Sequence, residues 1–296
     1  MSALPPPRRG VALALMVIAP VLWSMAGVLT RQVQSAGAFE MAFWRSSFAA
    51  VFVFFALLFL QDRRPWDTLR EAGVPGLVSG AMWAVMFTCF IVALTLTTVA
   101  NVLVVSSLGP LCTALLAFFM LREPIPGRSW LAIVAARLGM GAMFGAGFSA
   151  DDPRHVAGLA LALTIPIAGA INIVVLRKSA AHLDLMPAVM LGALISAAVT
   201  LPFALPWMAS ARDFAVLAAL GIFQLGVPCL MLVLAAGKLT APEIALLALL
   251  EVILGPLWTW LGAGEVPAGS TLAGGAIVLA ALAGNEAAAL AERKRV

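Results

Sequence analysis

The residues of this chain that could do chemistry are ionisable side chains placed inside long apolar runs. Glu251 stands in the middle of one such run, one helical turn before Gly255 and Pro256. A charged group in hydrocarbon is costly unless it is paired or faces a cavity, so it marks a functional site by default. Glu251 could couple transport to a proton or another cation, or bind a ligand ammonium group. The alternative is a protonated or arginine-paired structural group.

Two arginines occupy comparable positions. Arg137 lies in the middle of its apolar run, and it either pairs with an acidic group such as Glu251 or marks a site of its own. Arg45 lies a few residues from the end of its run. Its guanidinium could bind a carboxylate through two hydrogen bonds, or it could extend outward to water or pair with Glu40. The structural alternatives are favoured for Arg45, so the predicted coupling or ion-pair residues are Glu251 and Arg137.

Neutral polar and aromatic side chains complete the candidate site. Asn172 and Gln224 offer both donors and acceptors, and could bind a carboxylate and an ammonium group without a fixed charge. Trp23, Trp83 and Phe87 could form an apolar wall that stacks on a bulky side chain. The competing interpretation is that the two amides join helices, that Ser106 bonds to its own helix, and that the aromatic side chains pack or face lipid. The predicted substrate-binding residues are Trp23, Trp83, Phe87, Ser106, Asn172 and Gln224.

The composition indicates that helices in a membrane position these residues. Hydrophobic residues make up 63% of the chain and charged residues 11%, against roughly 45–50% and 25% in soluble proteins. The mean hydropathy is +1.06. So apolar a chain must face lipid. The cysteines Cys89, Cys112 and Cys229 all fall in apolar runs, which favours small core residues over disulfides or metal ligands.

The apolar runs number ten, and each is close to the roughly 20 residues that a helical crossing needs. They are continuous rather than alternating, which argues against a transmembrane barrel. The sequence therefore predicts an all-α integral membrane protein with ten transmembrane helices. The predicted spans cover residues 11–30, 38–60, 73–94, 99–121, 128–147, 156–176, 185–209, 214–236, 242–263 and 270–290.

The basic residues predict the orientation. With the N-terminus in the cytoplasm, thirteen of the 18 Lys and Arg residues fall in cytoplasmic segments, and only Arg31, Arg154 and Arg212 fall in outer loops. This bias is what the positive-inside rule requires when both termini are cytoplasmic. The net charge of +4 then reflects topology, and no basic stripe with stacking aromatics indicates a nucleic-acid partner. The predicted location is the cell inner (plasma) membrane.

The chain also contains an internal repeat. The run from Thr98 to Glu123 corresponds to the run from Thr240 to Glu265, 142 residues later. The motifs L-T-R-Q around Arg31 and V-L-R-K around Arg177 agree at a similar spacing. Since five spans per half is an odd number, the second half must enter the membrane from the opposite side. Two inverted halves that meet at the midplane permit alternating access.

The predicted organisation follows from this repeat. A cytoplasmic N-terminal segment covers residues 1–10, and the two five-helix repeats cover residues 11–150 and 151–290. A basic cytoplasmic tail covers residues 291–296.

Three motifs carry a resemblance to a known family: A-F-W-R in the second span, and the paired endings L-R-E-P and G-A-G-E of the fourth and ninth spans. With the ten-span length, they resemble the drug/metabolite transporter superfamily, and within it the ten-helix EamA-type exporters, over essentially the whole chain. A narrower likeness is to the YddG-type exporters of aromatic amino acids. The resemblance implies a central cavity lined by helices one, three, four, six, eight and nine. Relatives often carry a tryptophan early in helices one and six. Trp23 fits this pattern, whereas Gly169 departs from it and implies a wider or leakier site, or a variant.

The predicted function is a secondary transporter that exports amino acids, with aromatic or neutral ones favoured, or related small metabolites. Alternating access through the central cavity would move them across the inner membrane. A proton-coupled multidrug or metabolite exporter is the alternative. A membrane-embedded enzyme is less favoured, because such an enzyme would be expected to gather several His, Asp or Arg residues on one membrane face, and this sequence does not. We expect no cofactor and no metal. The expected partners are the small-molecule substrate and the lipid bilayer, and the expected assembly is a monomer or a weak homodimer.

Overall fold

The computed structural model of this chain is a bundle of helices. It describes residues 8–60, 65–121, 127–145, 152–179, 186–236, 239 and 241–293, and no strand occurs within them. Among these residues, seven helices are long and apolar enough to cross a membrane, and two shorter apolar helices cover Leu247–Ala263 and Gly269–Asn285. The predicted fold class is thus confirmed: the protein is an all-α membrane protein.

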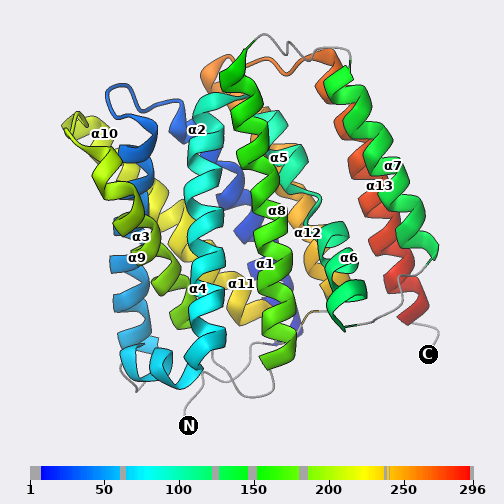
Figure 1. The fold of residues 1–296 in the computed structure, drawn as a ribbon, viewed down its shortest axis with the longest axis horizontal. Helices are drawn as coiled ribbons and strands as arrows, with labels where there is room; N and C mark the ends of the chain where they lie inside the picture. Colours follow the sequence, from blue (N-terminus) through cyan, green and yellow to red (C-terminus); the bar gives the residue numbers. More distant parts are fainter. Residues whose placement is uncertain are drawn as a thin grey trace.

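The described helices form ten passages through the bundle. Three passages are interrupted: the first at Met25, the fourth at Ser107 and Leu108, and the eighth by a π-helix. Figure 1 shows successive passages alternating in direction, with the start of α1 and the end of α13 at the same end of the bundle. The helices are α1 (Arg9–Ser24), α2 (Ala26–Thr30), α3 (Ala38–Leu60), α4 (Pro65–Leu96), α5 (Val99–Ser106), α6 (Gly109–Leu121), α7 (Gly127–Gly145), α8 (Pro153–Ser179), α9 (Met186–Ala204), α10 (Ala211–Ala219), η1 (Leu220–Gly226), α11 (Val227–Ala236), α12 (Ala241–Ala263) and α13 (Gly269–Arg293).

The packing of the bundle is organised around α4. This helix packs against α8 and α9, while α1 packs against α11 and α12, and α3 packs against α9. The helices α7 and α13 pair along one edge (Figure 1). Exchanging the first five passages with the last five reproduces this pattern. The contact of α8 with α5 and α6 corresponds to that of α1 with α12, and the α3–α9 and α7–α13 pairs map onto themselves.

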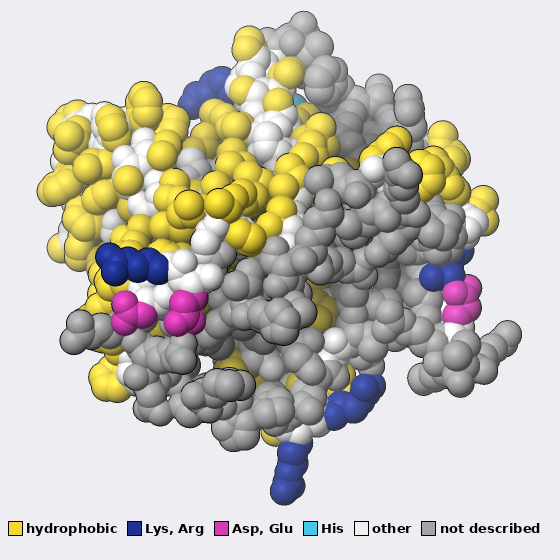
Figure 2. All heavy atoms as spheres, turned by 60° about the horizontal axis from the view of Figure 1, so that its bottom comes forward, with side chains coloured by type: hydrophobic (Ala, Val, Ile, Leu, Met, Phe, Trp, Pro, Cys, Tyr) yellow, Lys and Arg dark blue, Asp and Glu magenta, His cyan; other side chains and the backbone are white. Residues whose placement is uncertain are grey.

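The outer surface of the bundle is apolar. Large side chains on it are strongly exposed, among them Phe59 at 86%, Phe119 at 75% and Leu131 at 74%. Figure 2 shows hydrophobic side chains over much of the described surface, with acidic side chains next to basic ones at the left and right of the view. Apolar patches of this extent on a monomer mark contact with another apolar phase. For helices of this length, that phase is the lipid bilayer.

Small residues allow the closest helix contacts. A Cβ atom at Gly192 of α9 would overlap Cβ of Trp83 and lie 3.0 Å from the carbonyl oxygen of Gly80, both in α4. A Cβ atom at Gly139 of α7 would lie 2.8 Å from the carbonyl oxygen of Gly274 in α13. Gly139 and Gly274 therefore serve helix packing within one chain.

Carboxylates join the segments at the distal end of the bundle, which is the end away from the start of α1 and the end of α13 (Figure 1). Glu265 accepts a hydrogen bond from Nε of Arg31 at 2.8 Å and another from the backbone N–H of Val99 at 2.7 Å. Glu40 accepts from the backbone N–H groups of Met208 and Ala209. These bonds tie segments from both halves of the chain together at the distal end.

Asp213 adds to these links at the start of α10. It accepts hydrogen bonds from the backbone N–H groups of Gln34 and Ser35, each at 3.0 Å. It also caps its own helix through reciprocal bonds with Ser210, an arrangement that satisfies otherwise unpaired donors at a helix start. One carboxylate therefore fixes both the helix end and the loop between α2 and α3.

The close approach of α9 to α4 yields a stability prediction. Gly192→Ala should lower the free energy of unfolding by about 1–3 kcal/mol, because the added methyl group collides with Cβ of Trp83. The measurement is the thermal unfolding midpoint of the purified protein in detergent. Gly169→Ala is the matched control, since its Cβ would lie 3.5 Å from Sδ of Met86, an ordinary contact. Equal midpoints for the two variants would contradict the packing described here.

Candidate functional site

A cavity of about 240 Å³ lies in the middle of the bundle. Both halves of the chain line it. The first half contributes α1, α3, α4 and α5, and the second half contributes α8, η1, α11 and α12. The family resemblance implied a cavity lined by passages one, three, four, six, eight and nine, and all six line this cavity. The second passage, α3, lines it as well. The volume of the cavity suits a small metabolite rather than a drug-sized molecule. The lining residues are Trp23, Arg45, Trp83, Met86, Phe87, Phe90, Ser106, Ile165, Gln224, Leu225, Cys229 and Glu251.

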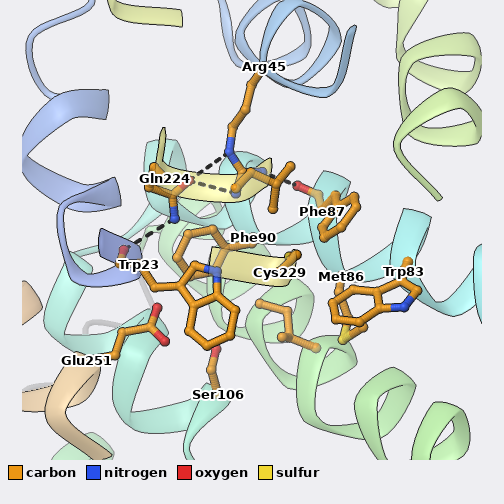
Figure 3. Close-up of a pocket in the computed structure, with 12 residues that line it drawn as sticks. Trp23, Arg45, Trp83, Met86, Phe87, Phe90, Ser106, Gln224, Cys229 and Glu251 are labelled. Carbon is orange, nitrogen blue, oxygen red and sulfur yellow. Dashed lines mark hydrogen bonds between the residues drawn. The ribbon is translucent and has the colours of Figure 1, made fainter. Parts of the chain in front are cut away.

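One face of α4 supplies the aromatic wall of the cavity. Trp83, Phe87 and Phe90 are spaced by four and three residues, which places them on the same side of a helix. The ring centroids of Trp83 and Phe87 lie 5.3 Å apart. Figure 3 shows Trp83, Met86 and Phe87 on one side of the cavity, and Phe90 and the indole of Trp23 nearer its centre. The wall offers a ligand several aromatic surfaces for stacking.

The π-helix η1 positions Gln224. Pro228 has no backbone N–H, so the carbonyl of Gln224 loses the partner that an α-helix would supply. The backbone instead widens, and the N–H of Val227 bonds to the carbonyl of Ile222, five residues back. Turns of this kind occur frequently at functional sites. The glycine at position 221 lets η1 approach α3 closely: a Cβ there would lie 2.5 Å from the carbonyl oxygen of Arg45.

Gln224 links two walls of the cavity. Its Oε1 accepts hydrogen bonds from Nε of Arg45 at 3.0 Å and from Nη2 of Arg45 at 2.9 Å. Its Nε2 donates to the backbone carbonyl of Trp23 at 3.2 Å. Figure 3 shows this chain of bonds running from α3 through η1 to α1. The amide is therefore held in one orientation, with its oxygen toward the guanidinium.

Arg45 is buried, with 2% of its surface exposed. Besides Gln224 it has a long contact of 3.5 Å from Nη1 to the carbonyl oxygen of Phe87, and its Cζ lies 5.9 Å from the ring centroid of Phe90. Both structural alternatives considered for Arg45 are wrong. The side chain does not extend outward to water, and Glu40 is bonded to backbone N–H groups at the distal end instead.

Glu251 brings the second charge to the cavity, from α12. Within the described residues its carboxyl group forms no hydrogen bond or ion pair. It interacts with Arg45 electrostatically, without direct contact. Figure 3 shows Arg45 and Glu251 extending from different sides, with Trp23 between them in this view. A cavity with one cation, one carboxyl group and an aromatic wall can bind a small ligand that carries both charge signs.

The structure brings six of the eight predicted site residues together. Trp23, Trp83, Phe87, Ser106, Gln224 and Glu251 all line the cavity. The hydroxyl of Ser106 donates to the carbonyl of Val102 one turn earlier, which was the alternative considered for it. Its oxygen still faces the cavity.

The remaining two predicted residues lie elsewhere. Asn172 is buried in α8 and does not line the cavity, and among the described residues its Oδ1 has no hydrogen-bonding partner. Arg137 belongs to α7, but its side chain lies outside the described part of the structure. Gly169, where relatives often have tryptophan, faces Sδ of Met86 at 3.5 Å from the Cβ position.

Sequence reasoning missed some of the lining residues. Arg45 was weighed but placed among structural residues, while Met86, Phe90 and Cys229 were not singled out. Phe90 and Met86 had a usable signal, because they lie within one turn of Phe87 in the same helix. Nothing in the pattern around Cys229 distinguishes it from other small apolar residues, and all three cysteines are free thiols in the structure.

Comparisons with known proteins agree with this architecture. Residues 10–145 match the model of the EamA-like transporter family. The chain is 26% identical over 282 residues to the pseudopaline exporter CntI of two Pseudomonas aeruginosa strains, a match that covers 93% of this chain and 94% of the relative. One crystal structure of another protein shares the fold, with a TM-score of 0.66 and 20% sequence identity. The match covers 98% of this chain and 100% of the chain in that crystal structure. The first half of the chain is thus similar to EamA-like transporters, and nearly the whole chain is similar to an exporter.

Proposed function

We propose that this protein is a secondary transporter that exports amino acids, aromatic and neutral ones above all, or related small metabolites, across the inner membrane. The observation that carries the proposal is the cavity lined jointly by both halves of the chain. The transporter family match and the similarity to a pseudopaline exporter support export of a small molecule. The aromatic wall of Trp83, Phe87 and Phe90 favours a substrate with a flat apolar side chain.

Alternating access is the proposed mechanism, with residues 11–150 and 151–290 as two inverted repeats. Residues 1–10 and 291–296 would form cytoplasmic ends. The packing pattern supports this division, because exchanging the two sets of five passages reproduces the helix contacts. Under the positive-inside rule the distal end faces away from the cytoplasm. The bonds of Glu265, Glu40 and Asp213 then close the outer side of the cavity. Opening to that side would require some of these bonds to break.

Counterflow in liposomes tests the proposed function. Purified protein in vesicles preloaded with unlabelled phenylalanine should accumulate labelled phenylalanine at equal pH on both sides. A carrier exchanges internal unlabelled substrate for external labelled substrate and needs no pH gradient to do so. Arg212→Gln, which changes an exposed arginine whose long contact joins it to Gln32 outside the cavity, should behave like the wild type. Failure to accumulate any amino acid of a labelled panel would remove amino acids as substrates.

Gln224→Ala should raise the substrate concentration needed for half-maximal flux by a factor of about ten. The variant removes the amide oxygen that accepts from Arg45 and the amide N–H that donates to the Trp23 carbonyl. Loss of one hydrogen bond to a charged group changes binding by about this factor. The concentration dependence of initial counterflow rates measures it. Flux identical to the wild type at every concentration would exclude Gln224 from the site.

A proton-coupled exporter of drugs or metabolites is the second candidate, and one observation favours it. Glu251 reaches the cavity, and within the described residues it has no hydrogen-bonding partner, so its carboxyl group is free to exchange a proton with the cavity. Intramembrane carboxyl groups in such positions act as proton relays in pumps and transporters.

Glu251→Gln separates the two candidates. If transport is coupled to protons, the variant should lose accumulation driven by a pH gradient and keep counterflow at equal pH, because glutamine preserves shape but cannot release a proton. The measurement is labelled substrate uptake into vesicles with and without an imposed gradient. A pH response that is unchanged in the variant would refute coupling through Glu251.

A further inference from the structure

In the described part of the chain, the buried cation of the cavity is hydrogen-bonded to neutral groups, and Glu251 acts on it only from a distance. Arg45 is 2% exposed, yet its two close hydrogen bonds both go to the neutral amide oxygen of Gln224. In the described residues no carboxylate contacts its guanidinium. A buried charge that is hydrogen-bonded but not compensated is unfavourable. An arginine with a purely structural role in a membrane is normally paired, so the arrangement calls for an anion from outside the protein.

The guanidinium of Arg45 has donors that Gln224 does not use. Gln224 occupies the edge formed by Nε and Nη2. The contact from Nη1 to the Phe87 carbonyl is long, at 3.5 Å. A guanidinium has five N–H donors in a fixed plane, so the edge between Nη1 and Nη2 keeps donors for a ligand. Two parallel N–H groups are the arrangement that binds a carboxylate with two hydrogen bonds.

Gln224 keeps this edge in place. Its amide is anchored at its other end by the carbonyl of Trp23, and η1 lies against α3 through the glycine at position 221. A neutral amide fixes the guanidinium without neutralising its charge. A carboxylate at the same position would form an ion pair with Arg45 and compete with any anionic ligand.

We propose that Arg45 binds the carboxylate group of the substrate, and that Gln224 is the positioning residue that holds the guanidinium for it. The substrate class is then a small carboxylate with a flat apolar side chain, lying between Arg45 and the aromatic wall of α4. This assignment deepens the proposed function and rests on it.

Three ligands of the same size and shape class test the assignment. Phenylalanine carries both a carboxylate and an ammonium group, phenethylamine lacks the carboxylate, and 3-phenylpropionate lacks the ammonium group. Their ability to inhibit counterflow of labelled phenylalanine is measured for each variant. The wild type should bind phenylalanine more tightly than phenethylamine by a factor of about ten or more, as expected for hydrogen bonds to charged groups.

Arg45→Gln should remove this preference, so that phenethylamine and phenylalanine inhibit about equally, and should weaken 3-phenylpropionate by a similar factor. Where labelled phenylalanine no longer exchanges, direct binding of the three ligands to the detergent-solubilised variant supplies the ratio. Arg45→Lys should restore part of the preference, because it keeps the charge but not the planar pair of donors. Arg212→Gln should leave all three ligands unchanged.

Gln224→Glu distinguishes ligand binding from a structural role. A purely structural Arg45 would gain an ion pair, and both stability and ligand preference would be kept. If Arg45 binds the substrate, the variant should keep or raise its thermal midpoint while its preference for phenylalanine over phenethylamine falls about tenfold. An unchanged preference in both Arg45→Gln and Gln224→Glu would overturn the role assigned to Arg45 but not the proposed function. Wild-type protein that binds none of the three ligands would overturn the proposed function as well.

Discussion

The bilayer offers no hydrogen-bonding partners, and this constraint accounts for much of the structure. Polar groups in the hydrocarbon region must be satisfied within the protein or face a cavity. The described helices satisfy their backbones internally, and several hydroxyl groups bond back to a carbonyl of their own helix, as those of Ser47, Thr113 and Thr259 do. Charged groups with polar contacts meet at two places that matter for the function, the central cavity and the distal end.

These two places use polar contacts in different ways. At the distal end, Glu265, Glu40 and Asp213 are saturated by N–H groups and an arginine, so their charges are compensated and hold loops together. In the cavity, Arg45 and Glu251 do not contact each other, and the two close hydrogen bonds of the arginine go to a neutral amide. The compensated charges of the carboxylates stabilise the distal end. The charges in the cavity lie near an aromatic wall and are not in contact with an opposite charge, so free energy remains available for binding a ligand.

Interruptions of the helices coincide with the cavity. The first passage breaks at Met25, next to Trp23, and the fourth breaks at Ser107, next to Ser106. The eighth widens into the π-helix that carries Gln224. Broken or widened helices are tolerated in membranes where they line a cavity, because the freed backbone groups can then be satisfied. The same pattern is seen in secondary transporters, whose binding sites lie at discontinuous helices near the midplane.

Much of the fold and part of the site could be predicted from the sequence alone. The apolar runs determine the helical class and the position of each passage, since a helix in lipid needs a run of about 20 apolar residues and little else. Mid-run polar and aromatic residues such as Gln224, Trp23 and Glu251 stood out as cavity candidates, because burying them without a purpose is unfavourable. Asn172 met the same criterion, yet it lies outside the cavity, because the criterion detects burial in the membrane but not the direction of a side chain.

What the tertiary structure decided is which polar groups meet. Arg45 and Gln224 are 179 residues apart in the chain, and no local pattern in either span indicates the other. Their contact depends on the closeness of η1 to α3, which the glycine at position 221 permits, and on the π-helix turn that rotates Gln224 toward the cavity. The sequence by itself determined that these residues must be satisfied somewhere inside the bundle. Only the packing of helices decided that a cation would be held by a neutral amide, because the pairing depends on long-range geometry that hydrophobic periodicity does not encode.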